Sequence, residues 1–325
     1  MIARKHRPNT KLPSPPTHQT EQQRIEHGGL IWLDFVRPGD DEVTFLSERY
    51  HFHPLHLKDV LSRLQRPQID DDQEREYVFL VLHFPVFDAN RRISVVSEID
   101  IFAGRDYIIT LHDGRLKPLS RLVSSSTSSE QVRAKIMSRG SGYLLYRIIN
   151  TLINECFRML YRVDANVDRI EDGIFNRNVQ ETVQELSFVR HDIITLRRII
   201  RPNIPVVRSL ELRERAFLHV DEDVYFGDLT DSLAKVWDML EEQNEIVVSL
   251  NATLDSLTSH RINEVMKIFT LISVILLPMT LVASILGMNV PLPFQDEPWA
   301  LPFSLVVMVI LALGMYIYFR YRGWV

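Results

Sequence analysis

The sequence has one cysteine, Cys156, among 325 residues. A lone cysteine cannot form a disulfide within the chain, and this usage fits a reducing cytoplasm. The sequence also has no glycine-rich phosphate loop, no nucleophile elbow and no acid and base paired in a setting that favours catalysis. We therefore expect neither an enzyme nor a prosthetic group. The residues after Met1 lack the apolar core of a signal peptide, so a later segment should direct membrane insertion.

Charged side chains are absent from two apolar runs near the C-terminus, Ile268–Leu286 and Leu301–Phe319. As a helix each run spans about 28 Å, which matches the hydrocarbon core of a bilayer. The nearest bases lie outside this pair of runs, at Arg261, Lys267, Arg320 and Arg322. Because positive residues favour the cytoplasmic side, we expect a multi-pass protein of the inner (plasma) membrane with both termini in the cytoplasm.

The residues before the apolar runs predict a cytoplasmic part. Segment 1–24 is basic and rich in proline, which is typical of a disordered tail. Runs rich in Val, Ile, Phe and Tyr then predict four strands, at Leu30–Phe35, Tyr77–Phe84, Ile99–Phe102 and Tyr107–His112. Apolar spacing of three and four residues predicts a helix at Pro54–Leu64. Residues 25–142 should therefore form an α+β domain, a mixed sheet with helices, in which the serine run Ser124–Ser129 is a loop or a helix N-terminus.

Helical periodicity continues from residue 143 to the end. No proline or glycine occurs from Asp228 until Pro278, which predicts one helix about 75 Å long that runs from the cytoplasm through the bilayer. The predicted segments are a helical hairpin packed on the cytoplasmic domain (143–222), a stalk helix (223–267), a first span (268–286), an external loop (287–300), a second span (301–319) and a cytoplasmic tail (320–325).

Two helices cannot enclose an ion pathway, so a transport function requires several copies of the chain. The first span and its approach carry small or polar residues at recurring spacing, which would line the pathway: Asn263, Thr270, Leu277, Thr280 and Ser284. Such residues also mediate helix packing in membranes, which is the alternative interpretation.

The tripeptide Gly287-Met288-Asn289 lies where the first span leaves the membrane. A neutral amide there has no value as an anchor, but its oxygen can bind the water shell of a cation. This suits Mg²⁺, which gives up its waters reluctantly. Glycine permits a close approach or an unusual backbone angle. The alternative is an ordinary turn at a helix C-terminus.

Between Asp221 and Glu245 the chain has nine acids and one base, Lys235. Several copies in a bundle would repel one another unless cations lay between them, which indicates a cation sensor. The alternative is a solvated acidic face paired with the arginine-rich segment Arg190–Arg215. The histidines His51, His53 and His56 permit a zinc site, but no Cys or carboxylate joins them at metal-ligand spacing.

The position of Gly287-Met288-Asn289, after a long charged helix and before a second span, resembles the CorA family of divalent-cation channels. Further matching segments are His53-Pro54-Leu55, Gln65-Arg66-Pro67, Phe102–Thr110, Tyr225-Phe226-Gly227-Asp228 and Arg261–Lys267. The resemblance implies a funnel-shaped homopentamer whose first spans line one axial pore, with a ring of Asn289 as the selectivity filter. It also implies a regulatory cation between subunits, bound by Asp228 and, by position, Asp88.

The same resemblance implies transport of Mg²⁺, with Co²⁺ or Ni²⁺ as further substrates. The sequence departs from the family pattern in the loop after the tripeptide, in a less basic C-terminus, and in Phe269 at a pore constriction. These departures leave open Zn²⁺ transport, as in the related ZntB branch, and a membrane cation sensor that does not conduct. The expected partners are further copies of the chain, the lipid bilayer and divalent cations, and not nucleic acid.

Overall fold

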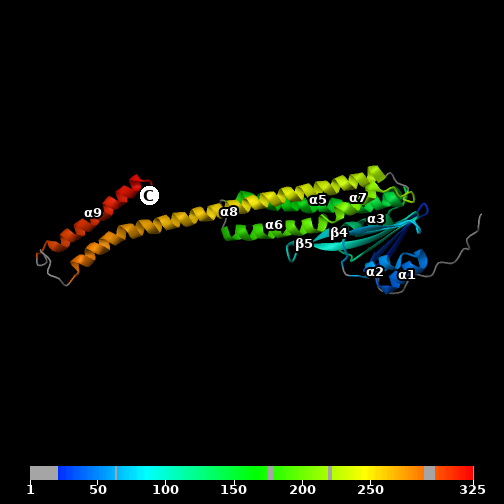
Figure 1. Cartoon of the computed structure of the whole chain (residues 1–325), viewed down its shortest axis with the longest axis horizontal. Coiled ribbons are helices and arrows are strands. Elements are labelled where there is room, and N and C mark those ends of the chain that lie inside the picture. Colours follow the sequence, from blue (N-terminus) through cyan, green and yellow to red (C-terminus); the bar gives the residue numbers. More distant parts are fainter. Residues whose placement is uncertain (1–20, 63, 175–178, 219–221, 289–296, 325) are drawn as a thin grey trace, which may run out of the picture. The chain divides into compact units, whose positions relative to one another are not determined.

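The computed structural model describes residues 21–62, 64–174, 179–218, 222–288 and 297–324 (Figure 1). The chain divides into two compact units, Met1–Ser249 and Leu250–Val325. The sheet belongs to the first unit, and the apolar helices belong to the second.

One mixed sheet forms the centre of the first unit. Its strands are β1 (Glu21–His27), β2 (Leu30–Val36), β3 (Gln68–Asp72), β4 (Tyr77–Asp88), β5 (Ile93–Gly104) and β6 (Tyr107–His112), in the order β1-β2-β6-β5-β4-β3. β2 and β6 are parallel, whereas the other neighbours are antiparallel. The mixed sheet of the predicted α+β fold is thereby confirmed.

Helices cover both faces of this sheet (Figure 1). On one face lie α1 (Asp40–Tyr50) and α2 (Pro54–Leu61), over an aromatic core in which Phe52 stacks on Phe102 with ring centres 4.1 Å apart. The other face carries α3 (Lys117–Ser128), α4 (Glu130–Met137), α5 (Ser141–Gly173), α6 (Val179–Ile200) and α7 (Asn203–Leu212). Alternate residues of each strand thus meet different helices, which explains why most of β4 is apolar on both faces.

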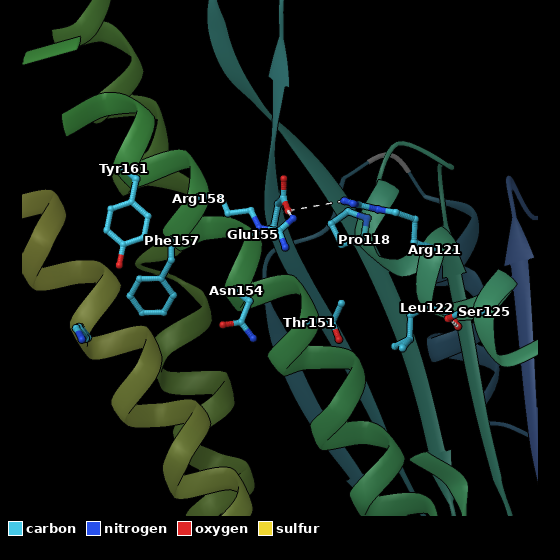
Figure 2. A pocket seen from close by; sticks show the side chains of 11 residues that line it. Pro118, Arg121, Leu122, Ser125, Thr151, Asn154, Glu155, Phe157, Arg158 and Tyr161 are labelled. Carbon is cyan, nitrogen blue, oxygen red and sulfur yellow. Dashed lines mark hydrogen bonds and ion pairs between the residues drawn. The ribbon is translucent and has the colours of Figure 1, made fainter. Parts of the chain in front are cut away.

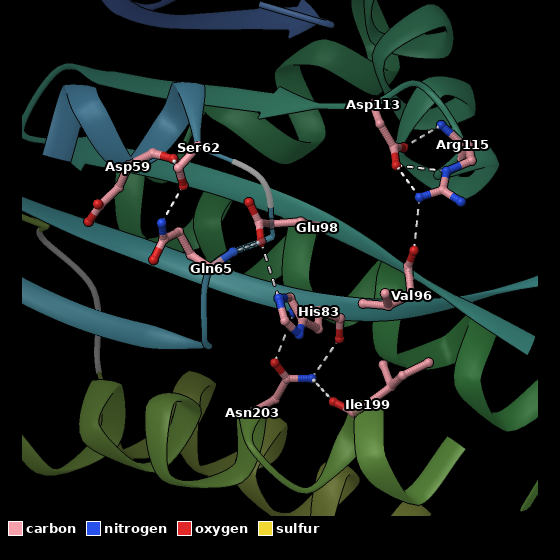
Figure 3. A network of polar contacts seen from close by, with 10 residues as sticks. All are labelled: Asp59, Ser62, Gln65, His83, Val96, Glu98, Asp113, Arg115, Ile199 and Asn203. Carbon is pink, nitrogen blue, oxygen red and sulfur yellow. Dashed lines mark hydrogen bonds and ion pairs between the residues drawn. The ribbon is translucent and has the colours of Figure 1, made fainter. Parts of the chain in front are cut away.

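Asn203, at the start of α7, completes the hydrogen bonding of β4. β3 pairs with β4 only as far as Val81, so the backbone of His83, two residues further along β4, has no strand partner on that side among the described residues. The Asn203 side chain takes this place: its Oδ1 accepts from the His83 backbone N–H at 3.0 Å, and its Nδ2 donates to the His83 carbonyl at 2.6 Å (Figure 3). One fully buried amide therefore satisfies the backbone where the strand is missing.

The long helix and the apolar pair are also as predicted. α8 (Glu222–Leu286) is a single helix of 65 residues that continues through Pro278, and α9 (Ala300–Tyr321) follows it. Both are long and apolar enough to cross a membrane. Pro278 has no N–H to donate to the preceding turn, a defect that membrane helices tolerate.

Several boundaries differ from the prediction. β1 begins at Glu21, inside the segment 1–24 that we expected to be a disordered tail, because residues 21–27 pair in register with β2; residues 1–20 lie outside the described part. α2 ends at Leu61 and not Leu64, since Ser62 is extended (φ −78°, ψ 159°).

The serine run was predicted to be a loop or a helix N-terminus outside the core, and this is wrong for most of it. Ser124–Ser128 lie in α3, where Ser126 is fully buried. Their hydroxyl groups donate to carbonyls three or four residues earlier, for example from Ser126 to Leu122 at 2.6 Å, which satisfies them inside the helix. Only Ser129 has the expected role, as the N-cap of α4.

Candidate ion pathway and cation site

One face of α8, along the first span and its approach, carries a row of side chains in which six of nine are Ser, Thr or Asn, and we call it the polar stripe. Its members follow one another at four or three residues and are all exposed in the described chain: Ser259, Asn263, Met266, Thr270, Ser273, Leu277, Thr280, Ser284 and Met288. This alternation returns to the same side of a helix every seven residues. The five predicted pathway residues therefore share one face. Ser273 and Met266 belong to it as well, and the seven-residue spacing from Thr280 would have found both.

The opposite side of this part of α8 is the less exposed one. Leu271 is 9% exposed, compared with 69% for Leu277 on the polar stripe. Ile275, Pro278 and Val282 continue the less exposed row. α9 is the other helix of this unit, and the Nζ of Lys267 donates to the carbonyl of Gly323 just beyond it, at 3.3 Å. The lower exposure of this row and the Lys267 contact indicate that α9 lies on the side of α8 away from the polar stripe.

The hydroxyl groups of the polar stripe bond to their own helix. Thr270, Ser273 and Thr280 donate to the carbonyls four residues earlier, at 2.8, 2.8 and 2.9 Å. Each hydroxyl proton is thus used inside the helix, while the oxygen keeps a lone pair that points outward. A row of such oxygens can accept hydrogen bonds from the water shell of a cation.

The tripeptide at the end of α8 is described only in part. The backbone N–H of Gly287 donates to Ala283 at 3.0 Å, and that of Met288 donates to Ile285 at 3.3 Å. Gly287 does not have a positive φ. A Cβ at this position would lie 3.2 Å from the Ala283 carbonyl oxygen, a tight contact that glycine avoids. Asn289 lies outside the described residues, so its filter role stays a prediction.

Asp88 and Asp228 lie far apart within one chain. Asp88 ends β4, and its Oδ1 accepts from the backbone of Asn90 at 2.9 Å. Phe87, the residue before Asp88, packs against the guanidinium of Arg162 on α5. Asp228 accepts a hydrogen bond from Tyr146 on the same helix. Tyr146 and Arg162 are sixteen residues apart on α5, or about 24 Å. A site that uses both carboxylates would therefore need two copies of the chain. Within the described residues, no three metal-ligating side chains come together.

Asp228 is exposed and ends a row of hydrogen bonds along α5, which we call the amide ladder. Asn154 donates to Asn150 at 2.8 Å, Asn150 donates to the Tyr146 hydroxyl at 2.9 Å, and Tyr146 donates to Asp228 Oδ2 at 2.9 Å. Burial and the carboxylate of Asp228 raise the pKa of Tyr146, so the phenol remains a donor. The second oxygen of Asp228 accepts no bond from the described residues. Sequence reasoning missed Tyr146, because its partner is 82 residues away.

The acidic run of α8 is only partly neutralised. Glu241 pairs with Arg197, in the arginine-rich segment, at 2.6 Å. Asp231, Asp238, Glu242 and Glu245 have no ion pair with any described residue. The side chains of residues 221–223 lie outside the described part. The paired-face interpretation therefore holds for Glu241, and exposed carboxylates remain along the rest of the run.

The histidine cluster has a structural explanation. His53 is the N-cap of α2, where its Nδ1 accepts from the backbone of Leu55 at 3.2 Å. His56 stacks on Phe79 and lies 2.8 Å from the Tyr77 hydroxyl, and burial lowers its pKa. His51 ends α1 in a left-handed conformation. These contacts favour helix boundaries and core packing over a zinc site.

The chain is similar to known proteins over nearly its whole length. The profile of the family described as "CorA-like Mg2+ transporter protein" matches residues 27–321. A Bacillus subtilis protein named as a metal ion transporter, YfjQ, is 30% identical over 96% of this chain and 94% of its own length. The cobalt/magnesium transport protein CorA of Thermotoga maritima is 28% identical over 87% of this chain and 80% of its own. The solved structure of the CorA magnesium transporter from Methanocaldococcus jannaschii superposes with a TM-score of 0.80 at 23% identity, and covers 91% of this chain and 92% of that one.

Proposed function

Because the chain belongs to the family of CorA-like Mg²⁺ transporter proteins, we propose that it is a divalent-cation channel of the inner (plasma) membrane. The polar stripe carries this proposal. Every Ser, Thr and Asn between residues 263 and 286 lies on the side of α8 that α9 leaves uncovered. A helix that only needed to anchor the chain would have no reason to sort these residues, whereas a hydrated ion needs acceptors along its path.

The channel is formed by several copies of the chain, in a homopentamer with α8 around the axis and α9 outside. The exposed polar stripe supports this arrangement, because it would otherwise face lipid. Both termini lie in the cytoplasm, as the positions of the bases around the two spans indicate.

The transported ion is Mg²⁺, with Co²⁺ as a second substrate, the two ions that appear in the names of the relatives. A ring of Asn289 binds the hydrated ion through neutral amide oxygens, with Gly287 and Met288 shaping the end of the helix. This outer-shell binding would select for an ion that keeps its water.

Cytoplasmic cations close the channel by binding between Asp228 of one copy and Asp88 of the next. The exposed second oxygen of Asp228 and the unpaired acids of α8 support this role. A bound cation would neutralise carboxylates that otherwise repel one another in the bundle.

Ion flux into liposomes that contain the purified protein tests the function, with Mg²⁺- and Zn²⁺-sensitive dyes read in parallel. We expect Mg²⁺ uptake, and loss of uptake in Asn289→Ala while cross-linking still gives a pentamer. Zn²⁺ uptake without Mg²⁺ uptake would replace the proposed ion. The absence of any flux would leave a non-conducting sensor, and wild-type flux in Asn289→Ala would remove the filter assignment.

A further inference from the structure

Three adjoining cavities lie along α3 in the first unit, two of them between α3 and α5, and we call them together the basic groove. The first, of about 780 Å³, reaches Lys235 on α8; it shares Glu155 and Arg158 with a second of about 250 Å³. The third, of about 870 Å³, lies along the serine run of α3 and shares Arg121 with the first. These volumes are in the range of small-molecule sites.

The charge of the basic groove is strongly one-sided. Its walls carry six cations, Arg115, Lys117, Arg121, Arg158, Arg162 and Lys235, and one acid, Glu155. This contrasts with the whole chain, in which acids outnumber bases by 42 to 37. The groove therefore concentrates positive potential in an acidic protein.

Carboxylates nearby do not balance these cations. Arg158 and Arg121 share Glu155, at 3.1 and 4.0 Å (Figure 2). Arg115 pairs with Asp113, and Arg162 reaches Asp192 only at 4.0 Å. Lys117 and Lys235 have no carboxylate within 4.0 Å in the described part of the chain. The buried Nη2 of Arg162 also has no hydrogen-bond partner there. Six cations thus face three carboxylates, and several donors are left for an anion.

Two aromatic side chains also line the basic groove. Phe157 and Tyr161 follow each other on α5 at a spacing of four residues, and Figure 2 shows both on the side of α5 toward α8, whereas Arg121 lies on the side toward α3. Tyr161 is 60% exposed, so one face of its ring is open to a ligand. Lys235 lies over Phe157, 6.0 Å from the ring centre. Aromatic faces beside bidentate guanidinium groups suit a planar base attached to phosphates.

The geometry points to a binding site for a phosphate-bearing small molecule in the basic groove, with a nucleoside polyphosphate as the best fit. Arg121, Arg158 and Lys235 bind the phosphates, and Phe157 with Tyr161 stacks on the base. Because Lys235 is the one base in the acidic run of α8, the bound anion would connect α8 to α3 and α5. The site does not depend on ion transport, so its test can fail while the channel proposal stands.

Equilibrium dialysis of the full-length protein in detergent, without divalent cations, tests the site with radiolabelled ATP. We expect saturable binding that inorganic triphosphate and adenosine displace about tenfold less well than unlabelled ATP. Lys235→Gln and Arg158→Gln should each weaken ATP binding about tenfold, through the loss of one charged donor. Lys58→Gln is the matched control, because Lys58 is exposed on α2 and lines none of the three cavities.

Tyr161→Leu separates the two parts of the site. This variant should lose the advantage of ATP over triphosphate but keep triphosphate binding. Triphosphate that binds the wild type as tightly as ATP would overturn the role of the aromatic pair. No saturable binding of any probe up to about 5 mM, or wild-type binding in both Lys235→Gln and Arg158→Gln, would overturn the site itself. The exposed position of Lys235 makes that variant safe for folding, and gel filtration confirms that each variant keeps the wild-type assembly.

Discussion

Replacing Asn203 by alanine tests whether one side chain completes the sheet. Asn203→Ala removes the partners of the His83 backbone N–H and carbonyl, and neither group has a neighbouring strand on that side. A buried backbone group without a partner costs about 1–3 kcal/mol, so the two together predict a loss of about 2–5 kcal/mol. For a unit of this size, such a loss lowers the melting temperature by roughly 5–15 °C.

Thermal unfolding of the full-length protein in detergent measures the loss, and hydrogen exchange of a peptide that covers β4 locates it. Exchange at His83 should accelerate before the rest of β4 opens. Asn154→Ala is the control, because it removes an exposed amide from α5. A melting temperature within about 1 °C of wild type, with unchanged protection of β4, would show that water replaces the amide and would refute the reasoning.

Three further predictions address the buried acid Asp100, the proposed cation sensor and the ion pathway. Burial, with Glu98 and Asp59 nearby, raises the pKa of Asp100 well above its usual range, and its Oδ1 has no hydrogen-bond partner in the described chain. The protonated Asp100 carboxyl therefore contributes its full share of the folding stability below about pH 4, and this contribution falls as the pH rises through the raised pKa. Asp100→Asn should raise the melting temperature at pH 7.5 and make it depend less on pH. An unchanged pH profile of the melting temperature would contradict this. Asp228→Ala should conduct at cytoplasmic Mg²⁺ levels that close the wild type, and superimposable dose-response curves of flux would rule out the sensor. Thr280→Val should slow Mg²⁺ flux about tenfold, because the polar stripe loses an acceptor, while Val282→Thr on the covered side of α8 leaves flux unchanged; equal effects would remove the stripe from the pathway.

The features predicted well were those that a local pattern determines. The two charge-free runs predicted the two apolar helices, and the long segment without proline or glycine predicted α8. The β-rich segments predicted four of the strands. The tripeptide and its flanking motifs led to the correct family. β3 was missed because Gln68–Asp72 is polar and has no apolar alternation; pairing with β4 holds it in place. Likewise, nothing near Asn203 indicates that its side chain would pair with a strand 120 residues away.

Part of the candidate site could also be predicted from the sequence, and part of it could not. A seven-residue period is visible in one chain, so the polar stripe could be predicted. The expected cation site could not be tested in this manner, because Asp88 and Asp228 lie at different levels of α5 and would meet only across copies. The basic groove also escaped prediction, since its cations come from α3, α5, α8 and the segment before α3, and Arg115 and Lys235 are more than a hundred residues apart.

The amide ladder has a direction. Asn154, Asn150 and Tyr146 each donate toward Asp228, so their dipoles align and each bond polarises the next. Asn154 also lines the basic groove. A cation that withdraws electron density from Asp228 would weaken the last bond, and an anion near Asn154 would reorient the first. The two ends of the amide ladder would then be thermodynamically linked: any factor by which a groove ligand changes cation affinity must equal the factor by which the cation changes affinity for that ligand.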